Sequence, residues 1–447
     1  MFDLIVIGAG PGGYEAAAHA GHLGKSVAIV EQADLGGTCL NVGCIPAKTF
    51  LRSSRLFREC REAAAFGILV ESPSFDLPAL VARKDHVVGT LTRGVAALLR
   101  STGVEVLAGT GRLVDRNTVE VGGERHEATN ILIATGARPA VPPIPGIDGE
   151  RVLDSTAVFA ITAVPERIAI IGGGYIGLEF ACFFNEIGTR VTVVEMLPQV
   201  AAGCDGEIAS RLLQSMRRAG VEFHLSSKVQ KIEGHSVDYL NKEGLAQAIT
   251  AEWVLNSTGR APNVQDLGLE EVGVDFGPRG VKTSDRGKTS VPGIWACGDV
   301  TGRRMLAHAA TREGIVAVNN MFGRKDRIRY HAIPSVIYTH PEVASVGSTE
   351  EELKAAGIEY KKSVVPMAVA GRFLIENESG SGIVKVLAGK KYSEILGVHA
   401  IGDASSEFIV AAAGMVETEM CISGASEIVF PHPTVSEALR EAILGIH

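Results

Sequence analysis

The sequence of 447 residues contains no apolar run long enough to cross a membrane. The longest uncharged apolar stretch, residues 168–178, ends at Glu179 and is well short of the roughly 18 residues that a membrane span requires. The first residues also lack a basic segment and a small-residue cleavage site, so we expect no signal or transit peptide. These absences predict a cytoplasmic protein without a membrane span.

Aromatic residues are scarce, at 5% of the chain, and the 43 basic residues are outnumbered by 51 acidic ones. The resulting formal charge of −8 disfavours general nucleic-acid binding, although it does not exclude a local basic patch. We therefore predict no nucleic-acid partner, and no residue pattern predicts a metal site. The hydrophobic content of 46% is typical of a globular protein, and the length corresponds to about three domains.

Two of the seven cysteines, Cys39 and Cys44, lie in the segment GGTCLNVGCIPAK at residues 36–48. Most thiols of a cytoplasmic protein stay reduced, so a pair spaced this closely favours a redox pair over a structural disulfide. We expect Thr38 and Asn41 to cap helices here, and a helix N-terminus would stabilise a thiolate. The alternative is two buried cysteines that happen to be neighbours.

A short apolar run at residues 4–7 is followed by Gly8-x-Gly10-x-x-Gly13, a helix-forming segment, a second apolar run and Glu31. This order predicts a dinucleotide-binding unit, because the glycines permit a tight turn and close approach of a pyrophosphate while the acid binds ribose hydroxyl groups. The glycine pattern alone is weak evidence, but here the complete strand–turn–helix–strand–acid context is present.

The same pattern returns 164 positions later, where Gly172, Gly174 and Gly177 are followed by Glu195. Two such units indicate two dinucleotides, and a flavin with a nicotinamide is the natural pair for redox chemistry. Glu195 favours NAD over NADP, because its carboxylate would repel a 2′-phosphate. The next residues, 196–207, contain no arginine that could bind that phosphate.

Three further segments indicate domain organisation or a candidate binding residue. Helical patterns at residues 50–65 and 77–100 precede a β-rich stretch and a Pro/Gly-rich linker at 141–146. Asp299 follows an apolar strand, where α/β folds bind ligands, although, taken alone, an Asp that caps the next helix is a fair alternative. From residue 331 the pattern becomes that of an α+β domain, with strands and an apolar helix over 407–423.

Near the C-terminus, His432 precedes a proline and Glu437 follows five residues later at the start of a helical pattern. A carboxylate that orients an imidazole and raises its basicity is one interpretation. The other is a surface histidine in a turn, with Glu437 as a favourable charge at a helix N-terminus. The spacing alone favours neither.

Taken together, these segments resemble the pyridine-nucleotide disulfide oxidoreductases, and the resemblance covers essentially the whole chain. The segment at residues 36–48 looks like the redox-disulfide signature of that family. Six further segments occur in the family's order, namely GGGYIGLE, STGRAPN, ACGDVTG, MLAHAA, YTHPEVASVG and HPTVSE.

The resemblance implies an α/β fold with two Rossmann-like dinucleotide-binding domains and a C-terminal α+β dimerisation domain. The expected boundaries are residues 1–145 for the first part of the FAD-binding domain, 146–270 for the NAD-binding domain, 271–330 for the segment that completes the FAD-binding and central domain, and 331–447 for the dimerisation domain.

The resemblance also implies roles for six catalytic residues. Cys44 would face the flavin as a charge-transfer thiolate, and Cys39 would exchange with the substrate's sulfur atoms. His432 would be the acid–base, held by Glu437, and would reach into the active site of the other subunit of a homodimer. The remaining two residues, Lys48 and Glu179, would form an ion pair beside the flavin ring.

Both cofactor sites follow from the same residue-by-residue match. The positions that match the FAD site are Gly8, Gly10, Gly13, Glu31, Lys48, Gly111, Thr135, Gly136, Ala137, Asp299, Met305, Leu306, Ala307 and His308. The positions that match the NAD site are Gly172, Gly174, Gly177, Glu179, Glu195, Val229 and Gly259.

The implied reaction is the oxidation of dihydrolipoamide, borne by a carrier protein on another chain, to lipoamide. Electrons would pass through a Cys39–Cys44 disulfide and FAD to NAD, in the service of a 2-oxo-acid dehydrogenase complex or of glycine cleavage. The first alternative is an NAD(P)H-dependent reductase of another disulfide, such as glutathione disulfide, and Glu195 argues against its NADPH-dependent form. A mercuric reductase is disfavoured because the chain lacks a C-terminal cysteine pair.

A flavoprotein subunit with only a structural role is a further alternative, but it predicts the loss of a cysteine, base or nucleotide motif, and none is lost. Two positions depart from the family's usual residues. Ala47 stands where the family usually has serine, and Phe430 stands where it usually has a second histidine. Neither change removes a reacting group, but Phe430 bears on the shape of the disulfide-binding channel.

Overall fold

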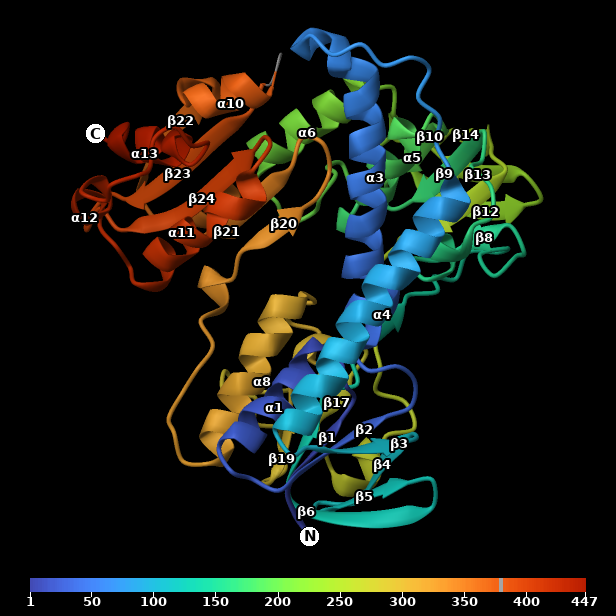
Figure 1. Ribbon diagram of the computed structural model, residues 1–447, viewed down its shortest axis with the longest axis vertical. Coiled ribbons are helices and arrows are strands. Elements are labelled where there is room, and N and C mark those ends of the chain that lie inside the picture. Colours follow the sequence, from blue (N-terminus) through green and yellow to red (C-terminus); the bar gives the residue numbers. More distant parts are fainter. Residues whose placement is uncertain (378–380) are drawn as a thin grey trace. The chain divides into compact units, whose positions relative to one another are not determined.

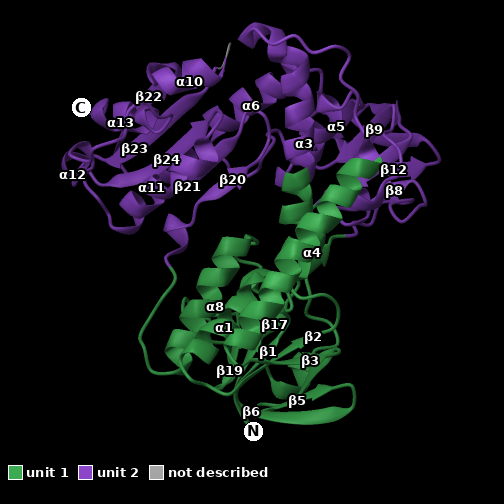
Figure 2. Cartoon of the chain, in the orientation of Figure 1, with its two compact units in different colours: residues 1–49, 78–140, 259–328 green, residues 50–77, 141–258, 329–447 purple. Residues whose placement is uncertain are grey.

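The computed structural model describes residues 1–377 and 381–447 (Figure 1). The chain divides into two compact units, coloured separately in Figure 2. Unit 1 comprises residues 1–49, 78–140 and 259–328, and unit 2 comprises residues 50–77, 141–258 and 329–447. Among the described residues, no helix is both long enough and apolar enough to cross a membrane.

Unit 1 is built on a seven-stranded sheet in the order β3-β2-β1-β6-β5-β4, with β19 paired to β6. Strands β1, β2, β3, β6 and β19 run parallel, and β4, β5 and β6 form an antiparallel meander. The bounds are β1 Phe2–Ile7, β2 Val27–Glu31, β3 Glu105–Ala108, β4 Gly111–Asp115, β5 Thr118–Val121, β6 Glu124–Ile133 and β19 Ile294–Ala296.

Successive side chains of β1 point to opposite faces of this sheet, and both faces are buried. Leu4 and Val6 belong to a core cluster with residues of the helices, whereas Ile5 and Ile7 belong to a second cluster that includes the meander. This pattern is that of a parallel strand covered on both sides. The helices of unit 1 are α1 Pro11–His22, α2 Gly37–Val42, the first turns of α3 Cys44–Glu62, most of α4 Leu77–Ser101, α7 Leu269–Val272 and α8 Ala307–Met321.

Small residues bring α1 and α8 close together. A Cβ on Gly314 would lie 2.4 Å from the backbone oxygen of Gly12, so only glycine allows this approach. Two short ribbons complete unit 1, formed by β7 Ala137–Pro139 with β16 Arg260–Pro262 and by β17 Phe276–Gly277 with β18 Gly280–Val281.

The first half of unit 2 repeats the dinucleotide-binding layout. Its parallel sheet has the order β11-β10-β9-β15-β8. A three-stranded meander, β12-β13-β14, comes between β11 and β15 in the sequence. The bounds are β8 Val152–Leu153, β9 Arg167–Ile171, α5 Tyr175–Glu186, β10 Arg190–Val194, α6 Gly206–Arg218, β11 Glu222–His224, β12 Lys228–Glu233, β13 Ser236–Leu240, β14 Ala246–Thr250 and β15 Trp253–Asn256.

The second half of unit 2 is an antiparallel sheet in the order β20-β21-β24-β23-β22, as the α+β pattern from residue 331 predicted. The apolar helix predicted to reach residue 423 ends earlier, because Glu419 adopts a positive φ of 52° and a second short helix follows. The bounds are β20 Ser335–Ile337, β21 Val343–Gly347, α9 Glu350–Ala355, β22 Tyr360–Pro366, α10 Gly371–Glu376, β23 Ile383–Gly389, β24 Ile395–Ile401, α11 Ser405–Glu417, α12 Ile422–Ser426 and α13 Glu437–Leu444.

A buried ion cluster joins these two halves within unit 2. The Lys385 ammonium, whose side chain is 1% exposed, lies 2.9 Å from Asp205 at the start of α6 and 2.5 Å from Glu350 at the start of α9. Burial opposes ionisation of both acids, but contact with Lys385 contributes to a net lowering of the pKa of Asp205 and of Glu350. The cluster therefore holds its charges together away from water.

Candidate active site

The turn between β1 and α1 has the shape of a pyrophosphate cradle. Gly8 adopts a φ of +103°, and a Cβ on Gly13 would lie 1.9 Å from the Gly8 oxygen. Gly10 caps α1 without a side chain, and among the described atoms a Cβ there would meet only the Gly37 Cα atom, at 3.9 Å. The helix N-terminus thus points into open space, as a bound phosphate requires.

Glu31 is fixed at the end of β2, beside this turn. One carboxylate oxygen accepts a hydrogen bond from Ala9 N at 2.8 Å, and the other accepts one from Ala33 N at 3.0 Å. These contacts fix the carboxylate where the acid of a dinucleotide-binding unit binds a ribose. The residues therefore fit the adenosine half of a dinucleotide such as FAD.

The second glycine turn repeats this geometry in unit 2. Gly172 has a φ of +105°, a Cβ on Gly177 would lie 2.1 Å from the Gly172 oxygen, and a Cβ on Gly174 would meet none of the described residues within 4 Å. Glu195 accepts hydrogen bonds from Gly173 N at 2.5 Å and from Leu197 N at 2.7 Å. The repeat predicted from spacing is therefore confirmed as a repeat of backbone shape.

The thiol segment lies directly against the first glycine turn, within unit 1. Gly36 N donates to Ala9 O at 2.8 Å. Gly37 has a φ of +58°, and a Cβ there would lie 2.6 Å from the Gly10 Cα atom. Glycines at these positions let the cysteine-bearing helices approach the dinucleotide turn, which is what a redox pair beside a flavin needs.

The helix-capping role that we predicted for Thr38 and Asn41 is wrong. Thr38 lies inside α2, whose N-cap is Gly36 with no side-chain cap. Asn41 instead donates from its side-chain amide to Leu35 O at 3.1 Å and to Gly37 O at 3.0 Å. These bonds hold the loop ahead of the helix in place, a role that only the folded backbone makes visible.

Cys39 lies in α2 and Cys44 is the first residue of α3. Both are free thiols, and a hydrogen bond joins their side chains. The hydrogen bond with Cys44, followed by burial, raises the pKa of Cys39, while the charge of Lys48 opposes the rise. The raised pKa favours the protonated thiol form of Cys39, and Cys44 lies at the N-terminus of α3.

The other predicted flavin residues of unit 1 lie next to strand ends of this unit or at the start of α8. Asp299 lies in a 3-10 turn just after β19, and burial raises its pKa while Arg260, at 3.8 Å, opposes the rise. It does not cap α8, whose N-cap is Leu306. The remaining predicted positions lie at strand or turn ends and at the start of α8, at Gly111, Thr135, Gly136, Ala137, Met305, Ala307 and His308.

Sequence reasoning missed the residues that brace the two turns. The Ser257 hydroxyl donates to Ile171 O at 2.9 Å and to Gly172 O at 3.0 Å. Asn263 accepts the Thr135 hydroxyl at its backbone oxygen, 2.8 Å away. Both residues lie in the segment STGRAPN, so the signal was present, but its role depends on strands that are distant in sequence.

The predicted nicotinamide positions of unit 2 are buried or follow strand ends. Glu179, 7% exposed, lies on α5 and accepts a hydrogen bond from Tyr338 N at 3.1 Å. Val229, 5% exposed, pairs with Tyr239 across the meander. Gly259, counted with unit 1, has a φ of +124° just after β15.

His432 and Glu437 form the predicted pair within unit 2. The imidazole Nδ1 lies 3.0 Å from Glu437 Oε1, and Thr434 N donates to Oε2 at 3.0 Å. The hydrogen bond with His432 lowers the pKa of Glu437. The His432 side chain is 78% exposed, so Nε2 is presented outward while Nδ1 is anchored.

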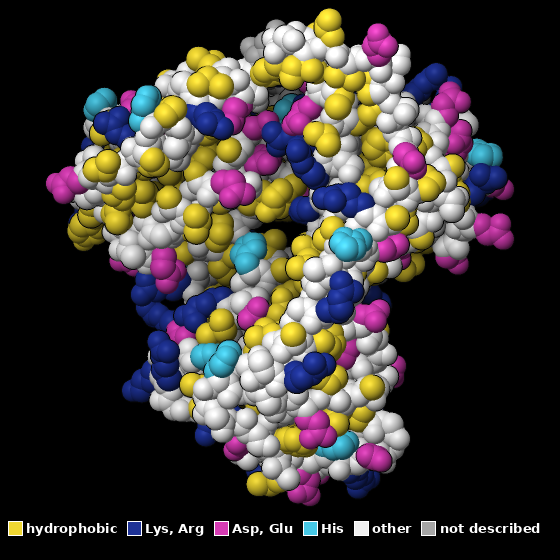
Figure 3. Space-filling view, viewed as in Figure 1, with side chains coloured by type: hydrophobic (Ala, Val, Ile, Leu, Met, Phe, Trp, Pro, Cys, Tyr) yellow, Lys and Arg dark blue, Asp and Glu magenta, His cyan; other side chains and the backbone are white. Residues whose placement is uncertain are grey.

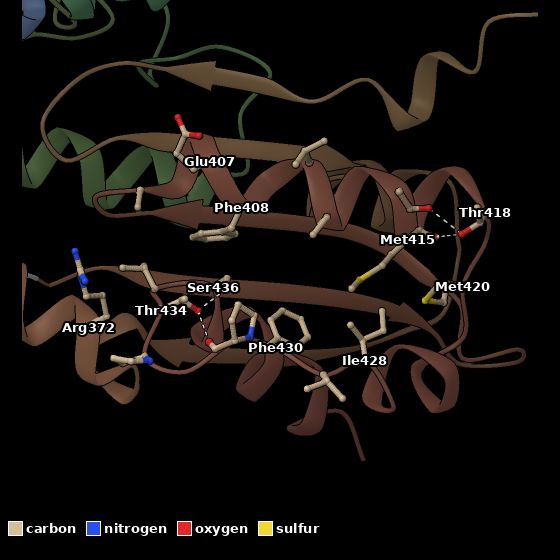
Figure 4. Close-up of a pocket in the computed structure, with 18 residues that line it drawn as sticks. Arg372, Glu407, Phe408, Met415, Thr418, Met420, Ile428, Phe430, Thr434 and Ser436 are labelled. Carbon is tan, nitrogen blue, oxygen red and sulfur yellow. Dashed lines mark hydrogen bonds between the residues drawn. The ribbon is translucent and has the colours of Figure 1, made fainter.

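An apolar groove of about 850 Å³ lies beside this pair (Figure 4). Phe408 and Met415 of α11 face Ile428 and Phe430 across it (Figure 4). The exposed side chains of Val410 and Val429, 69% and 91% exposed, add to the apolar surface. Phe430, one of the two departures from the family, therefore packs on an apolar wall next to His432.

Two family models together match almost the whole chain. Residues 2–314 match the pyridine nucleotide-disulphide oxidoreductase model, and residues 333–443 match the dimerisation domain of the same family. The chain belongs to the pyridine nucleotide-disulphide oxidoreductases. Members of this family use FAD and NAD, and the two glycine turns described above fit two dinucleotides.

Individual relatives are similar along their full length. The chain is 42% identical to dihydrolipoyl dehydrogenase 3 of Pseudomonas aeruginosa, covering 100% of this chain and 98% of that protein. It is 39% identical to the mitochondrial dihydrolipoyl dehydrogenase of Dictyostelium discoideum, covering 100% and 94%.

Solved structures agree with this family assignment. LpdA of Mycobacterium tuberculosis matches with a TM-score of 0.91 and 28% identity over 99% of each chain. The HOCl-induced flavoprotein disulfide reductase of Escherichia coli matches with a TM-score of 0.87 and 27% identity, also over 99% of each chain. The predicted fold class is thus confirmed.

Proposed function

We propose that this protein oxidises protein-bound dihydrolipoamide to lipoamide and reduces NAD to NADH. The observation that carries the proposal is the Cys39–Cys44 pair, which is held against a dinucleotide-binding turn by Gly36 and Gly37. Support comes from the dihydrolipoyl dehydrogenases, which are 36–42% identical to the chain over nearly its full length. The carrier would be a lipoyl protein of a 2-oxo-acid dehydrogenase complex or of glycine cleavage, in the cytoplasm.

The domain roles follow the predicted boundaries. We assign residues 1–145 and 271–330 to FAD binding, 146–270 to NAD binding and 331–447 to dimerisation. Bound FAD supplies a two-electron relay between a dithiol and a nicotinamide. Gly8, Gly10, Gly13 and Glu31 would hold its adenosine diphosphate half, and Lys48 would lie beside its ring.

The sulfur chemistry needs only groups of the chain. One thiol of the substrate, deprotonated by His432, attacks Cys39 of the oxidised pair, which breaks the Cys39–Cys44 bond and frees Cys44 as a thiolate. The second substrate thiol then attacks the substrate sulfur of the mixed disulfide, and its proton passes to the departing Cys39 sulfur, so that lipoamide closes and Cys39 returns as a thiol. The raised pKa of Cys39 supports its retention of that proton, while two electrons remain on the pair until they pass to NAD.

We infer that the working form is a homodimer in which the apolar groove is covered by a second copy. Residues 333–443 match a dimerisation domain, and the groove with its exposed valines lies in that segment. Val429, at 91% exposure, would otherwise present an unfavourable apolar surface to water. In such a dimer the outward-facing His432 of one copy would serve the thiol pair of the other.

A steady-state rate panel on the purified protein tests the reaction. We expect fast turnover of dihydrolipoamide with NAD, and slow or no turnover with NADP, because the fixed Glu195 carboxylate would repel a 2′-phosphate. Reduction of glutathione disulfide by NADPH at a higher rate would contradict the substrate and the coenzyme. That result would not contradict the assignment of the fold or of the thiol pair.

A further inference from the structure

One surface of unit 1 is strongly basic, although the whole chain is acidic. Residues 276–328, all of them described, contain ten Lys and Arg but only four Asp and Glu, whereas the chain has a net charge of −8. Glu313 is buried and Asp299 lies against Arg260, while Asp326 is paired with Arg312 at 2.7 Å. Asp285 is the remaining acid of this segment, so basic residues outnumber acidic ones here by six.

Backbone contacts bring five of the basic residues together. The Arg303 guanidinium donates to the backbone oxygen of Thr283, and Ile328 N donates to the backbone oxygen of Asp285 at 3.0 Å. The segment around 282–286 therefore lies between those around 303 and 327. We call the resulting patch the basic surface, formed by Lys282, Arg286, Arg303, Arg304 and Arg327, all of them exposed.

The charges of this patch are available to a partner. Among the residues that the structure describes, Lys282, Arg286, Arg304 and Arg327 form no ion pair. Figure 3 shows dark blue side chains gathered along the segment that follows α8, a segment whose sequence includes Arg327. Cationic side chains that neutralise no acid of their own leave a positive potential, which extends into solvent and attracts anionic molecules.

The basic surface continues into the proposed flavin site of the same unit. Arg303 and Arg304 come directly before residues 305–308, which begin α8 and belong to the predicted FAD positions. A partner held at this surface would be held on the unit that carries the thiol pair.

We propose that the basic surface is the docking site for an acidic face of the lipoyl-carrying protein. This inference rests on the proposed function, because it requires a substrate that is attached to a protein. A carrier must meet the enzyme and leave again in every cycle, and complementary charge at a rim raises the encounter rate without making the complex long-lived. Nucleic acid and anionic membranes share the negative charge, but the reaction offers neither a role.

The test compares a carrier-bound and a free substrate on the full-length enzyme. The probe is a lipoylated carrier domain of net negative charge, reduced to its dihydrolipoyl form, with free dihydrolipoamide as the reference. The variant carries Lys282→Glu, Arg286→Glu and Arg327→Glu, and a second variant carries Gln at the same positions. A matched control reverses three other exposed cations, with Arg116→Glu, Arg125→Glu and Lys242→Glu.

We expect kcat/KM for the carrier to fall about tenfold in the Glu variant and less in the Gln variant. The turnover of free dihydrolipoamide by the Glu and Gln variants should stay within about twofold of the wild-type rate. The control variant should stay within the same range with both substrates. The wild-type rate with the carrier should also fall as salt rises, and this dependence should weaken in the Glu variant.

Carrier kinetics that do not change in the Glu variant would overturn the docking site while leaving the reaction intact. A wild type that oxidises neither substrate would instead overturn the proposed function, and this inference with it. If the variant keeps wild-type carrier kinetics but loses binding to polyuridylic acid or to phosphatidylglycerol vesicles, the surface belongs to another class of partner and the proposal fails.

Discussion

At the scale of single residues, Glu195 carries the choice of coenzyme. Both of its carboxylate oxygens accept backbone N–H groups, from Gly173 and Leu197, so the charge cannot swing away from a bound ribose. We expect Glu195→Gln to raise KM for NAD about tenfold, which corresponds to about 1.4 kcal/mol. The Glu195→Gln variant should also discriminate less against NADP, because the negative charge that repels the 2′-phosphate is removed.

Steady-state kinetics with both coenzymes check this prediction. Glu222→Gln is the matched control, because Glu222 lies on the neighbouring strand β11 and is 63% exposed. Equal coenzyme preference in the Glu195→Gln variant and the wild type would show that another group sets the selectivity.

The imidazole of His432 depends on a single carboxylate for its orientation. Because Glu437 holds Nδ1 at 3.0 Å, we expect Glu437→Gln to lower kcat by about tenfold and His432→Gln to lower it by about 10² or more. The pKa of Glu437 is lowered by this contact, so the carboxylate stays ionised below its usual pH range. The acidic limb of the wild-type pH–rate profile should therefore not show the pKa of an ordinary glutamate.

A pH–rate profile of dihydrolipoamide oxidation measures both effects. The control is Glu441→Gln, one turn further along α13 and paired with Arg440, which should keep wild-type kcat. A kcat for Glu437→Gln that equals wild type would remove this residue from the proposed mechanism.

At the scale of elements, the position of the thiol-bearing helix α2 depends on Gly37. Its φ of +58° and the 2.6 Å that would separate a Cβ from Gly10 Cα leave no room for a side chain. We expect Gly37→Ala to push α2 away from the dinucleotide turn, so that the purified protein retains less than about half of its flavin.

Gly67→Ala separates this crowding from ordinary backbone strain. Gly67 also has a positive φ, of +77°, but a Cβ there would have no neighbour within 4 Å in the part of the chain that the structure describes. We expect Gly67→Ala to lower the free energy of unfolding by about 1 kcal/mol and to leave the flavin content unchanged. Flavin absorbance per protein at 280 nm and thermal unfolding check the pair, and full flavin content in Gly37→Ala would refute the proposed contact.

The elements also show why some of the site was predictable from the sequence and some was not. Both dinucleotide turns follow from local patterns, because the strand, the glycines and the terminal acid lie within about 25 residues of one another. The packing of Gly37 on Gly10 and the bonds of Asn41 to Leu35 O and Gly37 O depend on the folded path of the backbone. No pattern of residue types encodes that path, which is why Asn41 was wrongly assigned as a cap.

At the scale of the whole molecule, long-range polar contacts are the hardest feature to foresee. Asp205 and Lys385 are 180 positions apart in sequence, yet they lie 2.9 Å from each other in the interior of unit 2. Each residue alone reads as a surface charge, since lysine and aspartate are almost never fully buried unless they are paired. The overall fold was nonetheless predictable, because seven short segments occur in the order of one family and each specifies its own local structure.

This cluster makes the stability of unit 2 depend on one lysine. Lys385→Met would leave Asp205 and Glu350 without their buried cation, and we expect a loss of about 3–5 kcal/mol in the free energy of unfolding at pH 7. Lys390→Met is the control, because its partner Glu359 is 76% exposed and their surface pair contributes little.

The pH dependence separates lost ion pairing from lost packing. The pKa values of Asp205 and Glu350 are lowered in the folded protein, so their contribution to stability is complete above their ordinary values near 4 and is lost as the pH falls through the lowered ones. The stability gap between wild type and Lys385→Met, measured by urea unfolding, should therefore narrow as the pH falls from 7 to below 4. A gap that stays constant over this range would mean that Lys385 contributes through its packing rather than through its charge.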